Sequence, residues 1–213
     1  MPNTQNIYYP KELSWLSFNQ RVLQEAADVT NPIIERIRFL GIYSNNMDEF
    51  YRVRVADVKR KIYIHLNEGE LEEAEQTKLL MERIQEKVLG MTKDFDRIHS
   101  TVVKGLARYN IFLLGEEDLN NYHTQWLSHY FKNKILRHIA PVLLNKKVKL
   151  VTRLNDFATY LYVGVHKDDK AIAYATIEVP SQNMSRFVVI PPEKSRKKKY
   201  IILLDDIIRL NLE

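Results

Sequence analysis

The sequence of 213 residues is 45% hydrophobic and 28% charged with only 6 glycines and 7 prolines, which excludes a disordered chain and is typical of a folded, helix-rich one. It contains no cysteine, which excludes a disulfide framework, a thiolate metal site and a cysteine nucleophile. The net charge of +5 is compatible with nucleic acid, anionic lipid, or a polyanionic or nucleotide substrate, and it selects none of them.

The N-terminal stretch MPNTQNIYYPKEL has no apolar signal segment, and no apolar run in the chain approaches the ~20 residues of a membrane span. Cysteine is also absent, which is typical of proteins in a reducing cytosol. Together these features predict a cytoplasmic protein without a transmembrane segment.

Two helices are expected in the first third of the chain. The stretch ELSWLSFNQRVLQEAAD predicts a helix that ends near Asp28. The following TNP places Thr30 or Asn31 as the N-cap of a second helix, with Pro32 in its first turn. Residues at steps of three or four predict one continuous buried face on this second helix: Ile33, Ile37, Leu40, Ser44, Met47, Tyr51, Val55, Val58 and Ile62.

A third helix is expected after a polar, Glu-rich connection near residues 65 to 76. Its predicted buried face has the same spacing and consists of Leu80, Ile84, Val88, Met91, Phe95, Ile98, Val102 and Leu106. Three helices with apolar faces predict a helical bundle.

The pattern changes near residues 107 to 110. NIFLL is a short apolar run, a helix is expected from about Tyr122 to Ile139, and TYLYVGVH, AIAYATIEV, RFVVI and YIILL predict strands. The turn-like residues between the first two of these strands indicate a β-hairpin. The second half is therefore expected to be α+β. The final DDIIRLNLE predicts a helix of which only the beginning is present, as in a fragment.

The stretch GIYSNNMDEF lies inside the second helix, where asparagine is a mediocre helix former. On a helix, Asn46 shares a face with Phe39, Tyr43 and Phe50, so its amide could pair with a purine edge while a ring such as Phe39 or Tyr43 stacks on the base. From spacing alone, the simpler interpretation is that Asn46 is exposed or bonds the local backbone.

Two segments are strongly basic. RVRVADVKRK, at residues 52 to 61, could bind phosphate, but basic residues near a helix C-terminus also complement the helix dipole and stay solvated, and this second interpretation is preferred. The loop at 194 to 199 could hold a polyanion or be a solvated hairpin end, and the sequence favours neither.

No P-loop, GxGxxG, HExxH, GxSxG or EF-hand pattern occurs in the sequence. The six histidines are scattered, and no pair has a ligand spacing with a matching carboxylate. We therefore expect no metal site and assign no catalytic residue in this chain.

The stretches KELSWLSFNQRVLQEAAD, NPIIERIRFLGIYSNNMDEFYRVRV and IEVPSQNMSRFVVIPPE resemble the phosphohistidine-dependent polyphosphate kinase family, in order and over nearly the whole chain. The resemblance implies an α+β chain with an N-terminal helical domain at 1–108 and a head domain with a mainly antiparallel sheet at 109–213. It also implies that two C-terminal domains, which carry the phosphohistidine and the Mg²⁺ ligands, are missing.

The resemblance implies a function for the parent protein, the reversible transfer of the γ-phosphate of ATP to polyphosphate through a phosphohistidine. It places the nucleotide contact of the family's SNN motif at Asn46, with Phe39 as the expected stacking partner, so ATP or ADP and polyphosphate are the expected ligands. A homo-oligomer is expected through the head domain, and the fragment alone is expected to be inactive. No nucleic acid is expected as a partner. The alternative is a non-catalytic basic module that binds a polyanion or a protein.

Overall fold

The structure, a computed structural model, describes residues 9–144, 154–167, 170–193 and 197–212. Its contacts divide the chain into two units, Met1–Leu106 and Ala107–Glu213. The first unit is helical, and the second combines helices with a small, mainly antiparallel set of strands, so the chain is α+β as expected. No helix in the described part of the chain is both long and apolar enough to cross a membrane.

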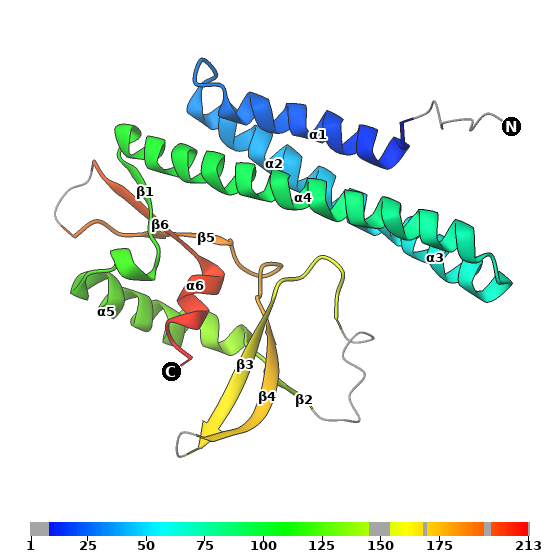
Figure 1. Cartoon of the computed structure of the whole chain (residues 1–213). Coiled ribbons are helices and arrows are strands. Elements are labelled where there is room, and N and C mark those ends of the chain that lie inside the picture. Colours follow the sequence, from blue (N-terminus) through cyan, green and yellow to red (C-terminus); the bar gives the residue numbers. More distant parts are fainter. Residues whose placement is uncertain (1–8, 145–153, 168–169, 194–196, 213) are drawn as a thin grey trace, which may run out of the picture. The chain divides into compact units, whose positions relative to one another are not determined.

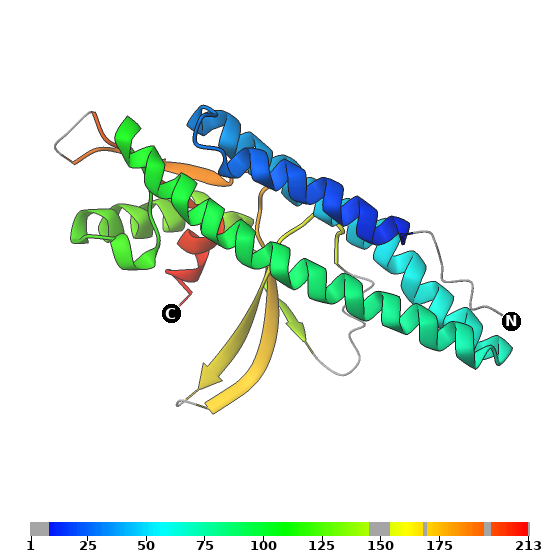
Figure 2. The same ribbon diagram turned by 45° about the horizontal axis from the view of Figure 1, so that its top comes forward.

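The first unit is built from α1 (Lys11–Ala27), α2 (Ile33–Glu49), η1 (Phe50–Val55), α3 (Ala56–Glu68) and α4 (Leu71–Leu106). In Figures 1 and 2, α1 and α2 form a hairpin, and the long α4 runs beside both of them and beside α3. One core holds these helices together, and its largest fully buried side chains include Leu16, Leu23, Phe50, Ile84 and Met91. The predicted bundle is confirmed.

The helix boundaries differ from the predicted ones at two points. Neither Thr30 nor Asn31 caps α2. Pro32 is the N-cap, and the side chain of Asp28 instead accepts hydrogen bonds from the backbone N–H and the hydroxyl of Thr30, both at 2.8 Å. The prediction of a long polar connection near residues 65 to 76 is also wrong, because α3 continues to Glu68. Gly69, with a φ of 78°, then ends the helix in the left-handed conformation that favours glycine.

The predicted buried face of α4 is confirmed, but that of the second helix is confirmed only in part, since Leu40 is buried and Ile33 and Met47 pack against the core. Among the predicted positions, Ser44 is exposed and Tyr51 is 48% exposed, whereas Tyr43 and Phe50 lie in the core. The exposure of Tyr51 is due to η1, a π-helix that inserts one extra residue per turn and shifts the buried face by one position. After η1 the predicted positions Val55, Val58 and Ile62 again lie on the core side.

The second unit contains β1 (Ile111–Leu113), α5 (Asn121–Tyr130), β2 (Val142–Leu144), β3 (Tyr160–Lys167), β4 (Lys170–Glu178), β5 (Phe187–Ile190), β6 (Lys199–Leu203) and α6 (Leu204–Arg209). Short helical turns precede and follow β1 and extend α5: η2 (Ala107–Tyr109), η3 (Glu116–Asp118), η4 (Phe131–Ile135) and η5 (Leu136–His138). Each predicted strand is present, as is the helix from about residue 122. The strand β2 was not predicted.

The strands form two three-stranded sheets. One has the order β1-β6-β5, in which β1 is parallel to β6 and β5 is antiparallel to it, and the other is antiparallel with the order β2-β4-β3. The helices α5 and α6 share a core with the first sheet. Figure 1 shows β3 and β4 as a long ribbon, the predicted hairpin, with Lys167 paired to Lys170. The tip of its turn lies outside the described residues.

Candidate functional site

Asn46 lies on the side of α2 that faces α1. Its Nδ2 donates a hydrogen bond to Oδ1 of Asn19 in α1, at 2.9 Å. Asn19 is fully buried, and its own Nδ2 donates to the backbone carbonyl of Tyr43, at 3.2 Å. The helix face that carries Asn46 is therefore coupled to α1 by two side-chain amides in series.

This pair of hydrogen bonds fixes the orientation of the Asn46 amide. The carbonyl of Tyr43 can only accept, so Asn19 must turn its NH₂ group toward it and its oxygen toward Asn46. Asn46 must then direct its NH₂ group at Asn19. One N–H and the Oδ1 of Asn46 remain without a protein partner among the described residues, and Asn46 is only half-buried.

A free amide N–H beside a free amide oxygen matches the edge of adenine, where an exocyclic amine lies next to a ring nitrogen acceptor. Sequence reasoning missed Asn19, because it lies 27 residues before Asn46 and only the packing of α1 on α2 brings the two together. A polar residue at a central position of an apolar helix face was the available signal.

The aromatic residues near Asn46 have different surroundings. Tyr43 is 5% exposed and stacks on Phe95 with ring centroids 5.3 Å apart, and burial raises its pKa to about 12. Phe50 is 1% exposed and stacks on Trp15 at 5.0 Å. Both rings belong to the core, so neither is open to a base.

Phe39 is half-buried and packs against the same core. It lies two helical turns before Asn46, roughly 10 Å along the axis at 1.5 Å per residue. Ile42 lies only one turn before Asn46 and is 47% exposed, so it is the nearer apolar side chain for a ring bound at Asn46. Phe39 is a partly exposed aromatic residue on that face of α2.

A hollow of about 270 Å³ opens on the opposite side of α2, against α4. It is lined by Tyr43, Ser44, Met47, Asp48, Tyr51, Val88, Thr92 and Phe95. Asn46 and Phe39 are not among its lining residues. Ser44 lies at this hollow, where its hydroxyl donates to the carbonyl of Leu40 at 3.0 Å.

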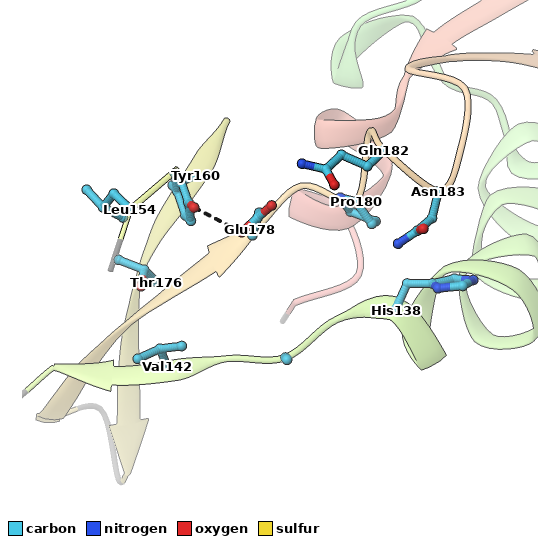
Figure 3. Close-up of a pocket in the computed structure, with 10 residues that line it drawn as sticks. His138, Val142, Leu154, Tyr160, Thr176, Glu178, Pro180, Gln182 and Asn183 are labelled. Atoms are coloured by element: carbon cyan, nitrogen blue, oxygen red, sulfur yellow. Dashed lines mark hydrogen bonds between the residues drawn. The ribbon is translucent and has the colours of Figure 1, made fainter. Parts of the chain in front are cut away.

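The second unit has a cavity of about 290 Å³ beside the sheet β2-β4-β3 (Figure 3). One oxygen of Glu178 accepts from the hydroxyl of Tyr160 at 2.9 Å and from the amide of Asn155 at 3.2 Å. His138 and Asn183 line another part of the wall. These groups can hydrogen-bond a small polar ligand, but no described hydrogen bond there joins a hydroxyl to a histidine base.

Three of the six histidines have structural surroundings. Nδ1 of His123, which is 5% exposed, accepts the backbone N–H of Asn120 in a capping box at the start of α5. His65 pairs with Glu70 at 2.6 Å, and His99 stacks on Phe95. Among the described residues, no group of three or more histidines and acids could hold a metal ion.

The predicted basic loop is only partly described, since residues 194 to 196 lie outside the described residues. At its C-terminal end, the Nζ of Lys198 lies 5.5 Å from the centre of the Phe112 ring, a cation–π contact between the loop and β1.

Family models match almost the whole chain. Residues 8–114 match the polyphosphate kinase N-terminal domain, and residues 122–213 match the polyphosphate kinase middle domain.

Among curated relatives, the polyphosphate kinases of Vibrio parahaemolyticus and Escherichia coli K12 are 44% and 47% identical over 211 and 209 residues. These matches cover 99% and 98% of this chain but 30% of each relative, so the chain spans about a third of the length of the curated relatives it matches. A crystal structure of polyphosphate kinase from Porphyromonas gingivalis superposes with a TM-score of 0.76 and 32% identity, over 94% of this chain and 30% of that one.

Proposed function

The chain belongs to the polyphosphate kinase family, and on this premise we propose that it supplies adenine recognition to an enzyme that makes polyphosphate from ATP. In the proposed reaction, the γ-phosphoryl group passes from ATP to a histidine nitrogen, with release of ADP. It then passes from the histidine to the terminal oxygen of polyphosphate. Each step is reversible.

The observation that carries this proposal is the pair of hydrogen bonds that links the backbone carbonyl of Tyr43 to Asn19 and Asn19 to Asn46. It leaves Asn46 with one free acceptor, Oδ1, and one free N–H donor, and it fixes the orientation of the amide that carries them. Adenine offers an exocyclic N–H donor beside the ring acceptor N7, whereas guanine offers two acceptors, O6 and N7, at the same edge. A fixed amide that binds this edge therefore favours adenine over guanine.

We assign recognition to Asn46, with Phe39 as the proposed stacking partner of the base, and no catalytic role to any residue of the chain. The phosphohistidine and the Mg²⁺ ligands are proposed to belong to the part of the family's length that this chain does not span. Phosphoryl transfer depends on positioning and on cations around the phosphoryl oxygens. Holding the adenine fixes one end of the nucleotide and so contributes to positioning.

We further propose that the second unit makes dimer contacts through the outer face of the sheet β2-β4-β3. Tyr162 and Tyr174 stack there with centroids 5.2 Å apart, although they are 64% and 46% exposed, and Ile172 beside them is 61% exposed. Large apolar side chains that gather on a solvent-facing sheet are typical of protein contact surfaces.

Calorimetric titration of the chain with ATP and with GTP tests the nucleotide proposal. We expect Asn46→Ala to weaken ATP binding about 10-fold or more, since two hydrogen bonds are worth roughly 0.5–1.5 kcal/mol each. Asn45→Ala is the matched control, because it removes the same group from the adjacent, exposed position and should leave binding unchanged. Absence of ATP binding by the wild type, or equal loss in both variants, would overturn the proposal.

A further inference from the structure

The π-helix η1 gives the chain an unusually broad solvent-facing surface. Phe50 and Val55 are both buried, and the four residues between them, at 51 to 54, are all exposed. An α-helix that packs on a core returns a side chain to the core every third or fourth residue, so it rarely leaves four in a row in solvent. The extra residue of the π-turn therefore displays both Arg52 and Arg54.

These two arginines border one surface hollow of about 550 Å³, which Arg60 closes from the following turns. Ala56 lies on the helix between these two arginines and Arg60, and its short side chain leaves room for the hollow. Val53 contributes apolar surface and is 45% exposed. Three guanidinium groups thus surround one concave site on the continuous helix formed by α2, η1 and α3.

The helical segment at residues 51 to 61 carries a net positive charge. Residues 51 to 61 contain five basic side chains and one acidic side chain, Asp57. Both oxygens of Asp57 are engaged: Oδ1 accepts from Arg60 at 2.6 Å and Oδ2 pairs with Lys61 at 3.2 Å. These contacts, that of Arg60 first, lower the pKa of Asp57. Asp57 thus anchors Arg60 and leaves the hollow with a net positive charge.

The helix dipole does not account for these arginines. Its effect falls off within the last turn of a helix. Arg52 and Arg54 lie in η1, several turns before the end of α3 at Glu68, so they do not complement a helix terminus. The dipole part of the sequence-based interpretation is therefore wrong for Arg52 and Arg54, whereas both side chains are exposed, as that interpretation expected.

We propose that the hollow bordered by Arg52, Arg54 and Arg60 binds the phosphoryl chain of a linear oligophosphate. Guanidinium groups pair with phosphoryl oxygens through two parallel N–H donors, and several of them along one helix suit a chain of repeated anions. Asp57 is the only carboxylate among the described residues that line the hollow, and both of its oxygens already contact basic side chains. The choice of oligophosphate rests on the proposed function, whereas the anion site rests on the arginines alone.

Titration with a linear polyphosphate of defined length, over a series of salt concentrations, tests the site. We expect Arg54→Gln/Arg60→Gln to weaken binding about 10-fold or more at low salt and to lower the slope of log K against log salt by about 1–2. The matched control is Arg38→Gln/Arg83→Gln, which removes two charges from exposed positions of the same unit. It also removes one arginine of an i,i+3 ion pair, as the test variant does. The control should weaken binding less than about 3-fold.

Equal loss in the two double variants would overturn the proposal, because it would show attraction to the net charge alone. Equally tight binding of single-stranded DNA of the same charge would overturn the assignment to oligophosphate. ATP calorimetry on the same variants separates this inference from the nucleotide proposal. If the nucleotide proposal is wrong, Asn46→Ala will leave ATP binding unchanged. If this inference is wrong, the arginine double variant will leave polyphosphate binding unchanged.

Discussion

Phe50 and Val55 are five residues apart, yet both are buried, with 1% and 5% of their surfaces exposed. A regular α-helix would turn the two side chains to different sides, because five residues correspond to nearly one and a half turns. The π-helix between them brings Val55 back to the core. Such single π-turns inside α-helices are frequent at functional sites, and this one displays the arginines of the proposed oligophosphate site.

The shift of the buried face predicts opposite effects at two adjacent aromatic residues. We expect Phe50→Ala to lower the free energy of unfolding by about 3–5 kcal/mol, since it removes a fully buried ring stacked on Trp15. Tyr51→Ala should cost less than about 1 kcal/mol, because Tyr51 is 48% exposed. Urea denaturation measures both. The continuous face expected from the sequence would require the reverse order.

Deleting Val53 should remove the π-turn without unfolding the chain. One residue fewer brings Phe50 and Val55 into the four-residue spacing of a regular α-helix, so the same core side chains stay inside. We expect an unchanged or higher melting temperature together with loss of polyphosphate binding. Deleting Gln85 from the regular helix α4 is the control, and it should destabilise the chain strongly because it turns the downstream buried face away from the core. Equal destabilisation by the two deletions would contradict this explanation of η1.

Asn19 should control the base preference of Asn46 without touching the nucleotide. Asn19→Leu removes the acceptor that holds the NH₂ group of Asn46, so the Asn46 amide becomes free to reverse. We expect the preference for ATP over GTP to fall several-fold while triphosphate binding persists. Calorimetry with both nucleotides measures this preference. An unchanged ATP-to-GTP ratio in a folded variant would show that Asn19 has only a packing role.

The pH dependence of stability should show the contribution of Asp206. Burial, and then repulsion from Asp205, raise the pKa of Asp206 above its ordinary value of 3.8. The folded state therefore binds this proton more tightly than the unfolded state, and stability falls as pH rises from 3.8 through the raised pKa.

Asp206→Asn should raise the melting temperature at neutral pH, by less than the roughly 4–8 °C that 1 kcal/mol brings to a unit of this size. The difference between variant and wild type should vanish below pH 3.8, where Asp206 is protonated in both states. Thermal melts across this range measure it, and a variant that is less stable at neutral pH would contradict the assignment.

The exposed tyrosine pair predicts the oligomeric state. We expect Tyr174→Lys to shift the chain from dimer toward monomer in sedimentation equilibrium, because it places a charge in the proposed contact face. Tyr63→Lys, at a 67% exposed position of the helical unit, is the control and should leave the dimer intact. A wild-type chain that is monomeric at high concentration would refute the proposed contact.

The regular elements could be predicted from the sequence because their side chains repeat with the period of the backbone. The buried face of α4 and the alternation of β5, where Val188 and Ile190 are buried and Phe187 and Val189 are exposed, are examples. The π-turn could not be predicted, since a five-residue step between Phe50 and Val55 looks like two unrelated positions when a period of 3.6 is assumed. β2 was missed because three residues are too few for a pattern.

Only part of the candidate site could be predicted from the sequence. Asn46 stood out as a polar residue among apolar ones, but its orientation depends on Asn19 and on a backbone carbonyl, and only tertiary packing brings these groups together. Tyr43 looked available for stacking because a helical spacing gives the face of a residue and not what packs against it. In the structure, Phe95 occupies that position.

The side-chain amide resonances of Asn46 and Asn45 in a ¹⁵N–¹H correlation spectrum, followed during titration with ATP, test the central claim most directly. The two N–H groups of Asn46 should be inequivalent before ATP is added, because one is bonded to Asn19. ATP should then shift the second of them while the Asn45 pair stays in place. A shift at Asn45 alone, or no shift at Asn46 at saturating ATP, would contradict adenine recognition by this amide.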